Sequence, residues 1–255
     1  MRREKKKRIT PVKTNKQAEV KYRRQLEILV KKLRSDVASQ IVPLLKILES
    51  EYVSDGYAQT LEEAFDNLRK SYIGIAANAK IAANTFTNDT DQANKKRFYK
   101  SIEKAVGVDL GSIVQSEDLT NVLVATTREN VNLIRSIPEE YFKNIESIVF
   151  SGTIQGSNAG SMIKRIQKAG KTSEKRAKLI ARDQSSKLNS ALTQQRSQNL
   201  GIEEYVWRTS EDGRVRENHK QHNGKTFRWD EPPKDTGHPG HDIQCRCVAQ
   251  PIINI

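Results

Sequence analysis

The stretch HPGHDIQCRC, residues 238–247, gathers side chains that the rest of the chain avoids. The protein has four histidines and two cysteines in 255 residues; two histidines and both cysteines lie in this stretch, and the other two histidines lie shortly before it. Two imidazoles and two thiolates form the ligand set that suits zinc in a closed tetrahedral site. We therefore predict a structural zinc site whose favoured ligands are His219, His238, Cys245 and Cys247.

The spacing of these residues leaves alternatives open. Zinc sites usually have two to four residues between paired cysteines, so the C-x-C pair is a less specific signal. His222 and His241 each lie three residues from a favoured histidine and are alternate ligands. Without a metal, the cysteines would be small buried apolar residues and the histidines surface polar groups. A catalytic metal is a further alternative.

The residues around this stretch predict a small, irregular β-rich module. After Gly201, the segments EEYVWRTS and KTFRW have the aromatic and β-branched residues of strands, and CRCVAQPII predicts a third strand that carries both cysteines. EDGR predicts a turn, and DEPPKDTGHPG predicts a loop. A module limited to residues 201–255 buries little apolar surface, so it needs an additional cross-link to be stable. A bound metal would supply that cross-link.

Residues 17–200 instead carry the periodicity of long amphipathic helices. Apolar residues recur every three or four positions over 17–52, 61–86, 95–106, 116–137 and 138–152. Pro43 predicts a kink, TNDTD at 87–91 a break, and Pro138 the start of a new helix. The fold class is therefore mainly α, with a C-terminal Cys/His module. The predicted regions are a basic flexible arm over 1–16, a helical region over 17–152, a hinge plus basic helices (161–168 and 173–199) over 153–200, and the module over 201–255.

The net charge of +13 falls mainly on two segments. Residues 1–16 carry eight Lys/Arg against Glu4, and residues 161–200 carry ten against Glu174 and Asp183. Cationic segments of this kind contact phosphates without reading bases, although the first run also fits a solvated, disordered arm. We predict sequence-independent binding of double-stranded DNA through Arg2, Arg3, Lys5, Lys6, Lys7, Arg8, Lys164, Arg165, Lys168, Lys171, Lys175, Arg176 and Lys178.

Composition argues against several other classes of protein. No apolar run approaches the ~20 residues that span a bilayer, and no apolar segment follows the charged start, so we expect no membrane partner and no secretory signal. Two cysteines two residues apart indicate no disulfide framework. With 36% hydrophobic and 6% aromatic residues, an elongated helical protein is favoured over an enzyme with a deep pocket, so we expect no small-molecule substrate.

Read as a whole, residues 130–252 resemble the phage Mu F-like minor head proteins, the phage head-morphogenesis family. The family pattern runs from a Trp-containing strand through Asp-x-Arg-x-Arg-x-x-His and Gly-x-x-Phe to a His-Pro-Gly loop and a terminal Cys-Arg-Cys. Its positions here are Trp207, Asp212, Arg214, Arg216, His219, Gly224, Phe227, His238, Pro239, Gly240, Cys245, Arg246 and Cys247. Many relatives have Cys-x-x-Cys where this chain has RENHKQH, which leaves open whether His219 or His222 acts as a ligand.

The resemblance implies a non-enzymatic minor capsid protein of a tailed phage that acts in head assembly or in DNA packaging or ejection. It would be carried inside the head near the portal, and would be in the host cytoplasm during assembly. The implied partners are the portal protein and packaged DNA, with coat or scaffold proteins as further candidates.

Two other functions compete with this one. A metal-dependent nuclease would draw its site from ENH (217–219) and HPGHD (238–242), although four protein ligands would leave the metal no open position. A basic DNA-binding adaptor would use the helices as a dimerisation rod. For the arginines, we expect a structural pair with Asp212, the alternative being phosphate binding by Arg214 or Arg246. We expect Trp207, Phe227 and Trp229 to form a small core rather than a base-stacking platform.

Overall fold

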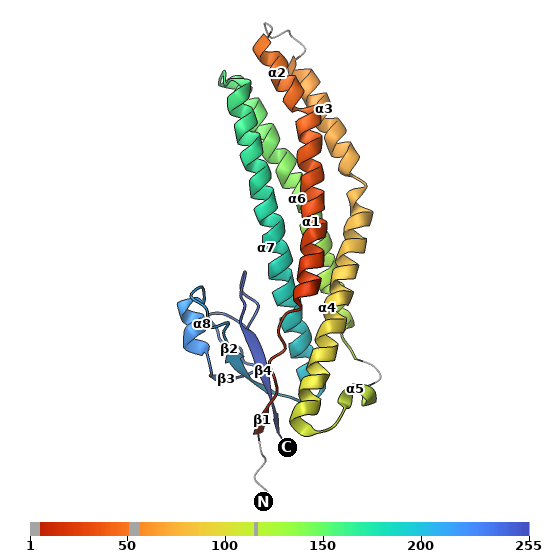
Figure 1. The fold of residues 1–255 in the computed structure, drawn as a ribbon, viewed down its shortest axis with the longest axis vertical. Coiled ribbons are helices and arrows are strands. Elements are labelled where there is room, and N and C mark those ends of the chain that lie inside the picture. Colours follow the sequence, from red (N-terminus) through yellow and green to blue (C-terminus); the bar gives the residue numbers. More distant parts are fainter. Residues whose placement is uncertain (1–5, 51–56, 115–116, 255) are drawn as a thin grey trace, which may run out of the picture. The chain divides into compact units, whose positions relative to one another are not determined.

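The computed structural model describes residues 6–50, 57–114 and 117–254, and it confirms the predicted fold class (Figure 1). Long helices are joined to a small antiparallel sheet formed mainly by the C-terminal module. The helices are α1 (Lys16–Gln40), α2 (Val42–Ser50), α3 (Tyr57–Tyr72), α4 (Ile75–Val106), α5 (Leu110–Ile113), α6 (Thr120–Ile154), α7 (Ala159–Asn199) and α8 (Glu217–His222). The strands are β1 (Lys6–Arg8), β2 (Glu204–Arg208), β3 (Thr226–Arg228) and β4 (Val248–Asn254).

The chain forms two compact units that interleave along the sequence. The first unit combines residues 1–21, 84–127 and 181–255, and the second combines residues 22–83 and 128–180. Because α1, α4, α6 and α7 each contribute residues to both units, the units do not follow the linear order of the predicted regions.

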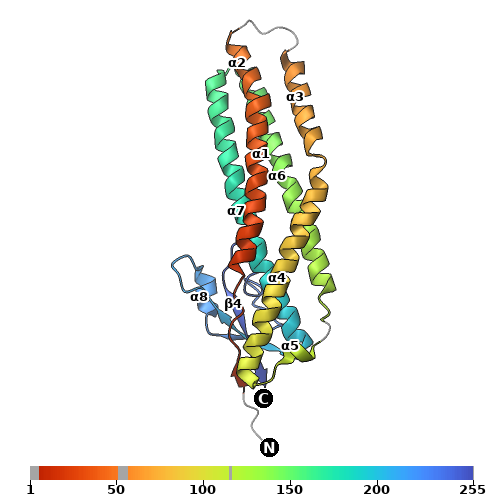
Figure 2. The same cartoon turned by 45° about the vertical axis from the view of Figure 1, so that its right-hand side comes forward.

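The second unit is a bundle of helices held together by apolar stripes. On α1, Leu26, Val30, Leu33 and Val37 are buried at the spacing that the sequence predicts. Burial of each such side chain contributes about 1.5–3 kcal/mol relative to exposure. Both views show α1, α6 and α7 side by side in this unit (Figures 1 and 2). The predicted interruption near Pro43 is confirmed, since α1 ends at Gln40 and α2 begins at Val42.

The predicted break at 87–91 is wrong, because α4 continues through TNDTD to Val106. Thr87, Thr90 and Asn94 are buried in the first unit, where tertiary contacts outweigh their weak helix propensity. The amide of Asn94 donates to Asn189 Oδ1 at 3.0 Å and to Thr193 Oγ1 at 3.0 Å, both on α7. The polar stretch is therefore an interface between two helices.

Two further predicted helix boundaries are also wrong. Pro138 lies inside α6, where its neighbours Ile137, Tyr141 and Phe142 are buried and tertiary packing outweighs the lost hydrogen bond. The two predicted basic helices form one helix, α7, and the predicted hinge over 153–160 is reduced to the short connection between Ile154 and Ala159.

The first unit contains the sheet, whose strand order is β1-β4-β2-β3 with every pair antiparallel. The strands predicted in EEYVWRTS and KTFRW are confirmed as β2 and β3. Over residues 6–16 the predicted flexible arm is not observed: Lys6 pairs with Asn254, and Ile9 and Val12 are buried against α4 residues. The N-terminal segment is thus an edge strand of the C-terminal module.

The loop before β4 docks on the C-terminal half of α7, which displaces the cysteines from the predicted strand. Both cysteines precede Val248, where β4 begins. The loop is held by three α7 side chains: Ser186 donates to Cys245 O at 2.6 Å, Ser190 donates to Pro239 O, and Asp183 accepts from Gln244 N at 2.7 Å. Gly240, with φ of +90°, packs so tightly that a Cβ would lie 2.9 Å from Ser190 Cβ.

Among the residues that the structure describes, no helix combines the length and the apolar character that a membrane crossing requires.

Candidate metal centre

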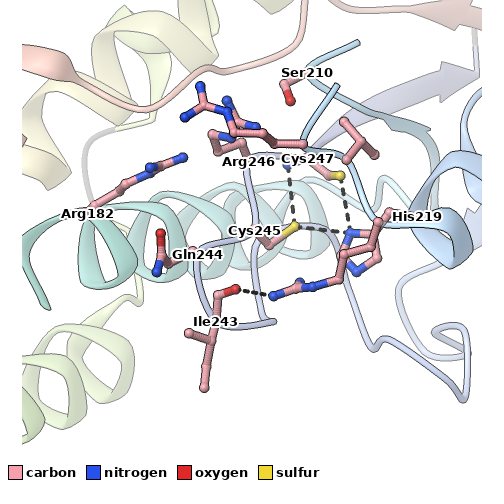
Figure 3. A pocket seen from close by; sticks show the side chains of 11 residues that line it. Arg182, Ser210, His219, Ile243, Gln244, Cys245, Arg246 and Cys247 are labelled. Atoms are coloured by element: carbon pink, nitrogen blue, oxygen red, sulfur yellow. Dashed lines mark hydrogen bonds between the residues drawn. The ribbon is translucent and has the colours of Figure 1, made fainter. Parts of the chain in front are cut away.

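Three of the four predicted ligands converge in the first unit. His219 lies on α8, and Cys245 and Cys247 lie in the segment that leads into β4. His219 Nδ1 is 3.5 Å from Cys245 Sγ and 3.4 Å from Cys247 Sγ (Figure 3). All three side chains are buried, and their ligand atoms lie within 4.8 Å of one another. Ligand atoms of a tetrahedral zinc site are about 3.5 Å apart, given bonds of about 2.0–2.3 Å, so this group could hold a metal ion.

Asp242 orients the imidazole of His219. Its Oδ2 lies 2.9 Å from His219 Nε2, so Nε2–H can donate to the carboxylate while Nδ1 faces the sulfurs. A carboxylate behind a histidine ligand is the usual support in metal sites, because it selects the tautomer and raises ligand basicity. The ring of Trp207 packs edge-on against the imidazole, with centroids 5.4 Å apart.

The two thiols are electrostatically unequal. A hydrogen bond from the Cys247 thiol, together with backbone N–H donors from Cys247 (3.4 Å) and Gly240 (3.3 Å), lowers the pKa of Cys245 to about 6. The same interaction with Cys245 and burial raise the pKa of Cys247. Cys245 is therefore available as a thiolate near neutral pH, and a bound cation would displace the proton that remains on Cys247.

The structure does not bring His238, the fourth predicted ligand, to this group. Its Nδ1 lies 3.0 Å from Tyr205 Oη, and its Nε2 lies 3.3 Å from Gln194 Nε2. Its ring packs against Trp229, with centroids 5.3 Å apart. Burial lowers the pKa of His238 to about 4, so the ring is neutral at physiological pH. His238 is thus part of the aromatic core of the module.

Both alternate histidines also lie outside the three-residue group. His222 Nε2 is 3.0 Å from Asp235 Oδ1, and its ring packs against Trp207. His241 is exposed and lies beside the ring of His238. Of the two histidines on α8, the fold therefore turns His219 toward the cysteines.

The other motif residues build the frame around the site. Arg246 pairs with both oxygens of Asp212, which is the expected structural pair. Arg216 donates to Ile243 O at 2.6 Å. Gly224 turns the chain with φ of +81° ahead of β3. The expected small core is also present, because a buried cluster packed against Phe227 contains Tyr205, Trp207, Trp229, Cys245, Cys247 and Ala249.

The predicted DNA-contacting residues lie in two places. Arg2, Arg3 and Lys5 fall outside the described residues. Lys6, Lys7 and Arg8 form β1, where Lys6 pairs with Glu204 at 2.6 Å. On α7, Arg176 pairs with Glu140 at 2.7 Å, and Lys178 lies 4.0 Å from Glu27. Five exposed cations follow one face of this helix: Lys164, Arg165, Lys168, Lys171 and Lys175.

Some functional side chains were not predicted in these roles. The sequence indicated Asp242 only as part of the HPGHD segment of a nuclease site. A carboxylate next to a histidine-rich motif could nevertheless have indicated a residue that hydrogen-bonds to a histidine ligand and orients it. Asp183, Ser186 and Ser190 lie on one face of a helix whose cations dominate its sequence. Their polar spacing of three and four residues marks the face that receives the loop.

Comparisons with known proteins agree with the motif. Residues 143–250 match the family model described as "Phage Mu protein F like protein". The resemblance to the phage Mu F-like family is confirmed over this stretch. An uncharacterized protein from Haemophilus influenzae (strain ATCC 51907 / DSM 11121 / KW20 / Rd) is 37% identical over 251 residues, which cover 96% of this chain and 55% of that protein. The chain thus spans about half the length of that relative. No solved structure matches the chain.

Proposed function

We propose that the chain is a non-enzymatic minor head protein of a tailed phage. It is carried inside the head, contacts the portal protein and packaged DNA, and acts in head assembly or in DNA packaging or ejection. The match of residues 143–250 to the phage Mu F-like family carries this proposal, since that match supports a head-morphogenesis protein. The long helices offer extended surfaces for protein partners.

The location of the polypeptide in purified particles tests the proposal. We expect it in DNA-filled heads, protected from added protease until the heads are opened, and cross-linked to the portal protein. Its absence from particles, with no cross-link to a head protein in assembling cells, would contradict the proposal and favour a DNA-binding adaptor.

DNA contact is supported by the five exposed cations on α7, because no ion pair among the described residues neutralises them. Replacing Lys164, Arg165, Lys168, Lys171 and Lys175 with glutamine should weaken binding to duplex DNA of any sequence. The slope of log affinity against log salt should become shallower by about 0.9 for each phosphate that the variant no longer neutralises. Fluorescence anisotropy over a series of salt concentrations measures both effects.

The control for this prediction neutralises five cations that already pair with carboxylates and are not among the predicted DNA-contacting residues: Lys21, Lys32, Arg69, Lys220 and Arg228. It removes the same net charge but leaves the α7 face intact, so its salt dependence should stay close to that of the unmodified protein. Equal losses in the two variants would show that net charge alone governs binding.

The Cys/His group leads to a second part of the proposal, that His219, Cys245 and Cys247 bind zinc. When bound, zinc would supply a cross-link between α8 and the segment before β4. Three features of the chain fit such an ion: three ligand atoms within 4.8 Å of one another, Asp242 behind His219, and backbone N–H donors to Cys245 Sγ. A small module with one aromatic cluster gains stability from a cross-link of this kind.

Replacing Asp242 with asparagine should weaken zinc affinity by about 10–100-fold, because the imidazole loses its charged support. Competition with a chromogenic chelator measures this affinity. Asp235→Asn is a matched control, since Asp235 supports His222, which lies outside the group. An affinity that is unchanged in Asp242→Asn, or equally reduced in Asp235→Asn, would argue against the assigned role of His219.

A metal-dependent nuclease is the second candidate function. One observation favours it: only three protein ligands converge among the described residues, so a bound ion would keep an open coordination position. Cleavage of DNA in the presence of Zn²⁺, Mg²⁺ or Mn²⁺ that is lost in His219→Ala would establish this function. We favour the structural role because Asp242, which could act as a base, is already engaged by His219 and Arg216.

A further inference from the structure

A cavity of about 310 Å³ lies beside the Cys/His group, and its lining is strongly cationic. Four arginines border it (Arg182, Arg214, Arg216 and Arg246), together with His219, Cys245 and Cys247. The described residues that line it include no carboxylate. In Figure 3, Arg182 and Arg246 lie on one side of the view and His219 on the other, with the two sulfurs between them. The cavity is several times larger than the ~30 Å³ that one water occupies in the liquid, so it has room for a polyatomic anion.

The four guanidinium groups differ in how far they are already engaged. Arg246 is bound to Asp212, and Arg216 donates to Ile243 O and lies 3.4 Å from Asp242 Oδ2. Arg214 is largely exposed, and its Nη2 reaches Asp212 Oδ2 only at 3.9 Å. Within the described residues, no hydrogen bond or ion pair engages the side chain of Arg182. Arg182 and Arg214 therefore have donors available for a ligand.

A lining with a net positive charge continues beyond this cavity. An adjoining cavity of about 660 Å³ shares Arg182, Ser210, Cys245 and Arg246 with the first one. It adds three cations and two carboxylates to the lining: Lys13, Lys16, Arg208, Glu19 and Glu211. Lys16 already pairs with Glu19, so Lys13 and Arg208 are the added cations that a ligand could reach. A single anion would fill only part of this space. A chain of phosphates could place one group beside the cysteines and the next ones along Lys13 and Arg208.

We propose that the arginine-lined cavity binds a phosphate group, with Arg182 and Arg214 as its main ligands and the backbone of nucleic acid as its source. Guanidinium groups pair with phosphate oxygens through two parallel hydrogen bonds. Phosphate is favoured over a carboxylate because two available arginines can serve several oxygens of one ligand. The adjoining cavity, whose lining carries more cations than carboxylates, also extends past a single anion. This site is separate from the cations on the earlier part of α7.

The proposal rests on the proposed zinc centre in one respect: His219, Cys245 and Cys247, which would hold the metal, line the same cavity. The ³¹P resonance of a phosphate bound there would therefore be affected by a paramagnetic ion held by these residues. The arginine site does not require the metal, and the two proposals can fail separately.

The 255-residue chain loaded with Co²⁺ provides the test, with inorganic phosphate as the probe. We expect saturable broadening of the ³¹P resonance by the paramagnetic ion and little broadening by the zinc-loaded protein. Arg182→Gln and Arg214→Gln should each raise the dissociation constant for phosphate at least about tenfold, which is typical for loss of a charge-assisted hydrogen bond. Arg228→Gln is the control, because Arg228 pairs with Glu203 and Asp230 away from the cavity.

Two competitors distinguish the sources of the anion. A short oligothymidylate that displaces phosphate supports the nucleic-acid backbone, and its failure to compete would overturn that source. Acetate at equal ionic strength should not compete; if it does so equally well, the site does not select phosphate. If the protein takes up no cobalt, the metal proposal fails, and calorimetric titration with phosphate still decides the arginine site. Equal affinities in the variants and the unmodified protein would overturn it.

Discussion

Replacing Cys245 with serine should remove bound zinc and destabilise the C-terminal module. We expect the unmodified protein to be purified with a stoichiometric amount of zinc, and both Cys245→Ser and His219→Ala to lose nearly all of it. Binding free energy of a metal that is held only by the folded state adds to folding stability. With free zinc at 1,000 times the dissociation constant, this addition is about 4 kcal/mol. Elemental analysis and thermal unfolding, with and without a chelator, measure the two effects.

The control separates a ligand from a neighbouring histidine. His241 lies in the same loop but outside the three-residue group, so His241→Gln should retain both zinc and stability. Protein that is free of metal after purification, and that unfolds identically with and without chelator, would remove the zinc proposal. Zinc lost equally in His241→Gln would contradict the ligand assignment.

Replacing Arg196 with methionine should destabilise the protein by about 3–5 kcal/mol, the usual cost of removing one partner from a buried ionic network. The Arg196 side chain on α7 is fully buried. It donates to Glu117 Oε1 at 2.9 Å and Oε2 at 2.8 Å, to Asp91 Oδ1 at 2.7 Å and to Asn94 Oδ1 at 2.7 Å. Methionine would remove the guanidinium group from Asp91 and Glu117 and leave Glu117 only Lys95 at 3.7 Å as a cationic neighbour. Urea denaturation followed by circular dichroism measures the change.

Acid should weaken the same network. Burial opposes ionisation of Glu117, but hydrogen bonds from Arg196 and Tyr99 outweigh it and hold its pKa below the usual 4.5. The stabilisation is therefore present above pH 4.5 and is lost as the pH falls through the lower pKa of the folded state. Arg196→Met should lack this part of the acid dependence.

An exposed network supplies the control for Arg196. Arg228 also pairs with two carboxylates, but its side chain is 45% exposed and solvent screens the pairs, so Arg228→Met should change stability far less than Arg196→Met. Adding Glu117→Gln and Asp91→Asn to Arg196→Met should recover part of the loss by removing the stranded charges. A loss in Arg196→Met no larger than that in Arg228→Met would show that the buried network contributes little.

Local patterns predicted the parts of the fold that local forces control. The apolar stripe on α1 and the residues of β2 and β3 depend on periodicity and propensity within a few residues, and each was found as predicted. The polar segment at 87–91 and Pro138 were wrongly predicted as helix boundaries. Their helical conformation depends on buried partners far away in the chain, such as Arg196 for Asp91.

The sequence by itself determined the chemistry of the candidate site, since only one region of the chain supplies thiols and imidazoles, and its motif spacing pointed to the phage Mu F-like family. Tertiary structure decided which of those groups meet. It places His219 beside the two cysteines and His238 within the aromatic core of the module. It also places Asp242 next to the His219 imidazole, on the side away from the sulfurs. It also brought Arg182 from α7 to the same cavity. These placements depend on contacts between segments that are distant in sequence. The pattern of residues within one segment does not specify how another segment packs against it.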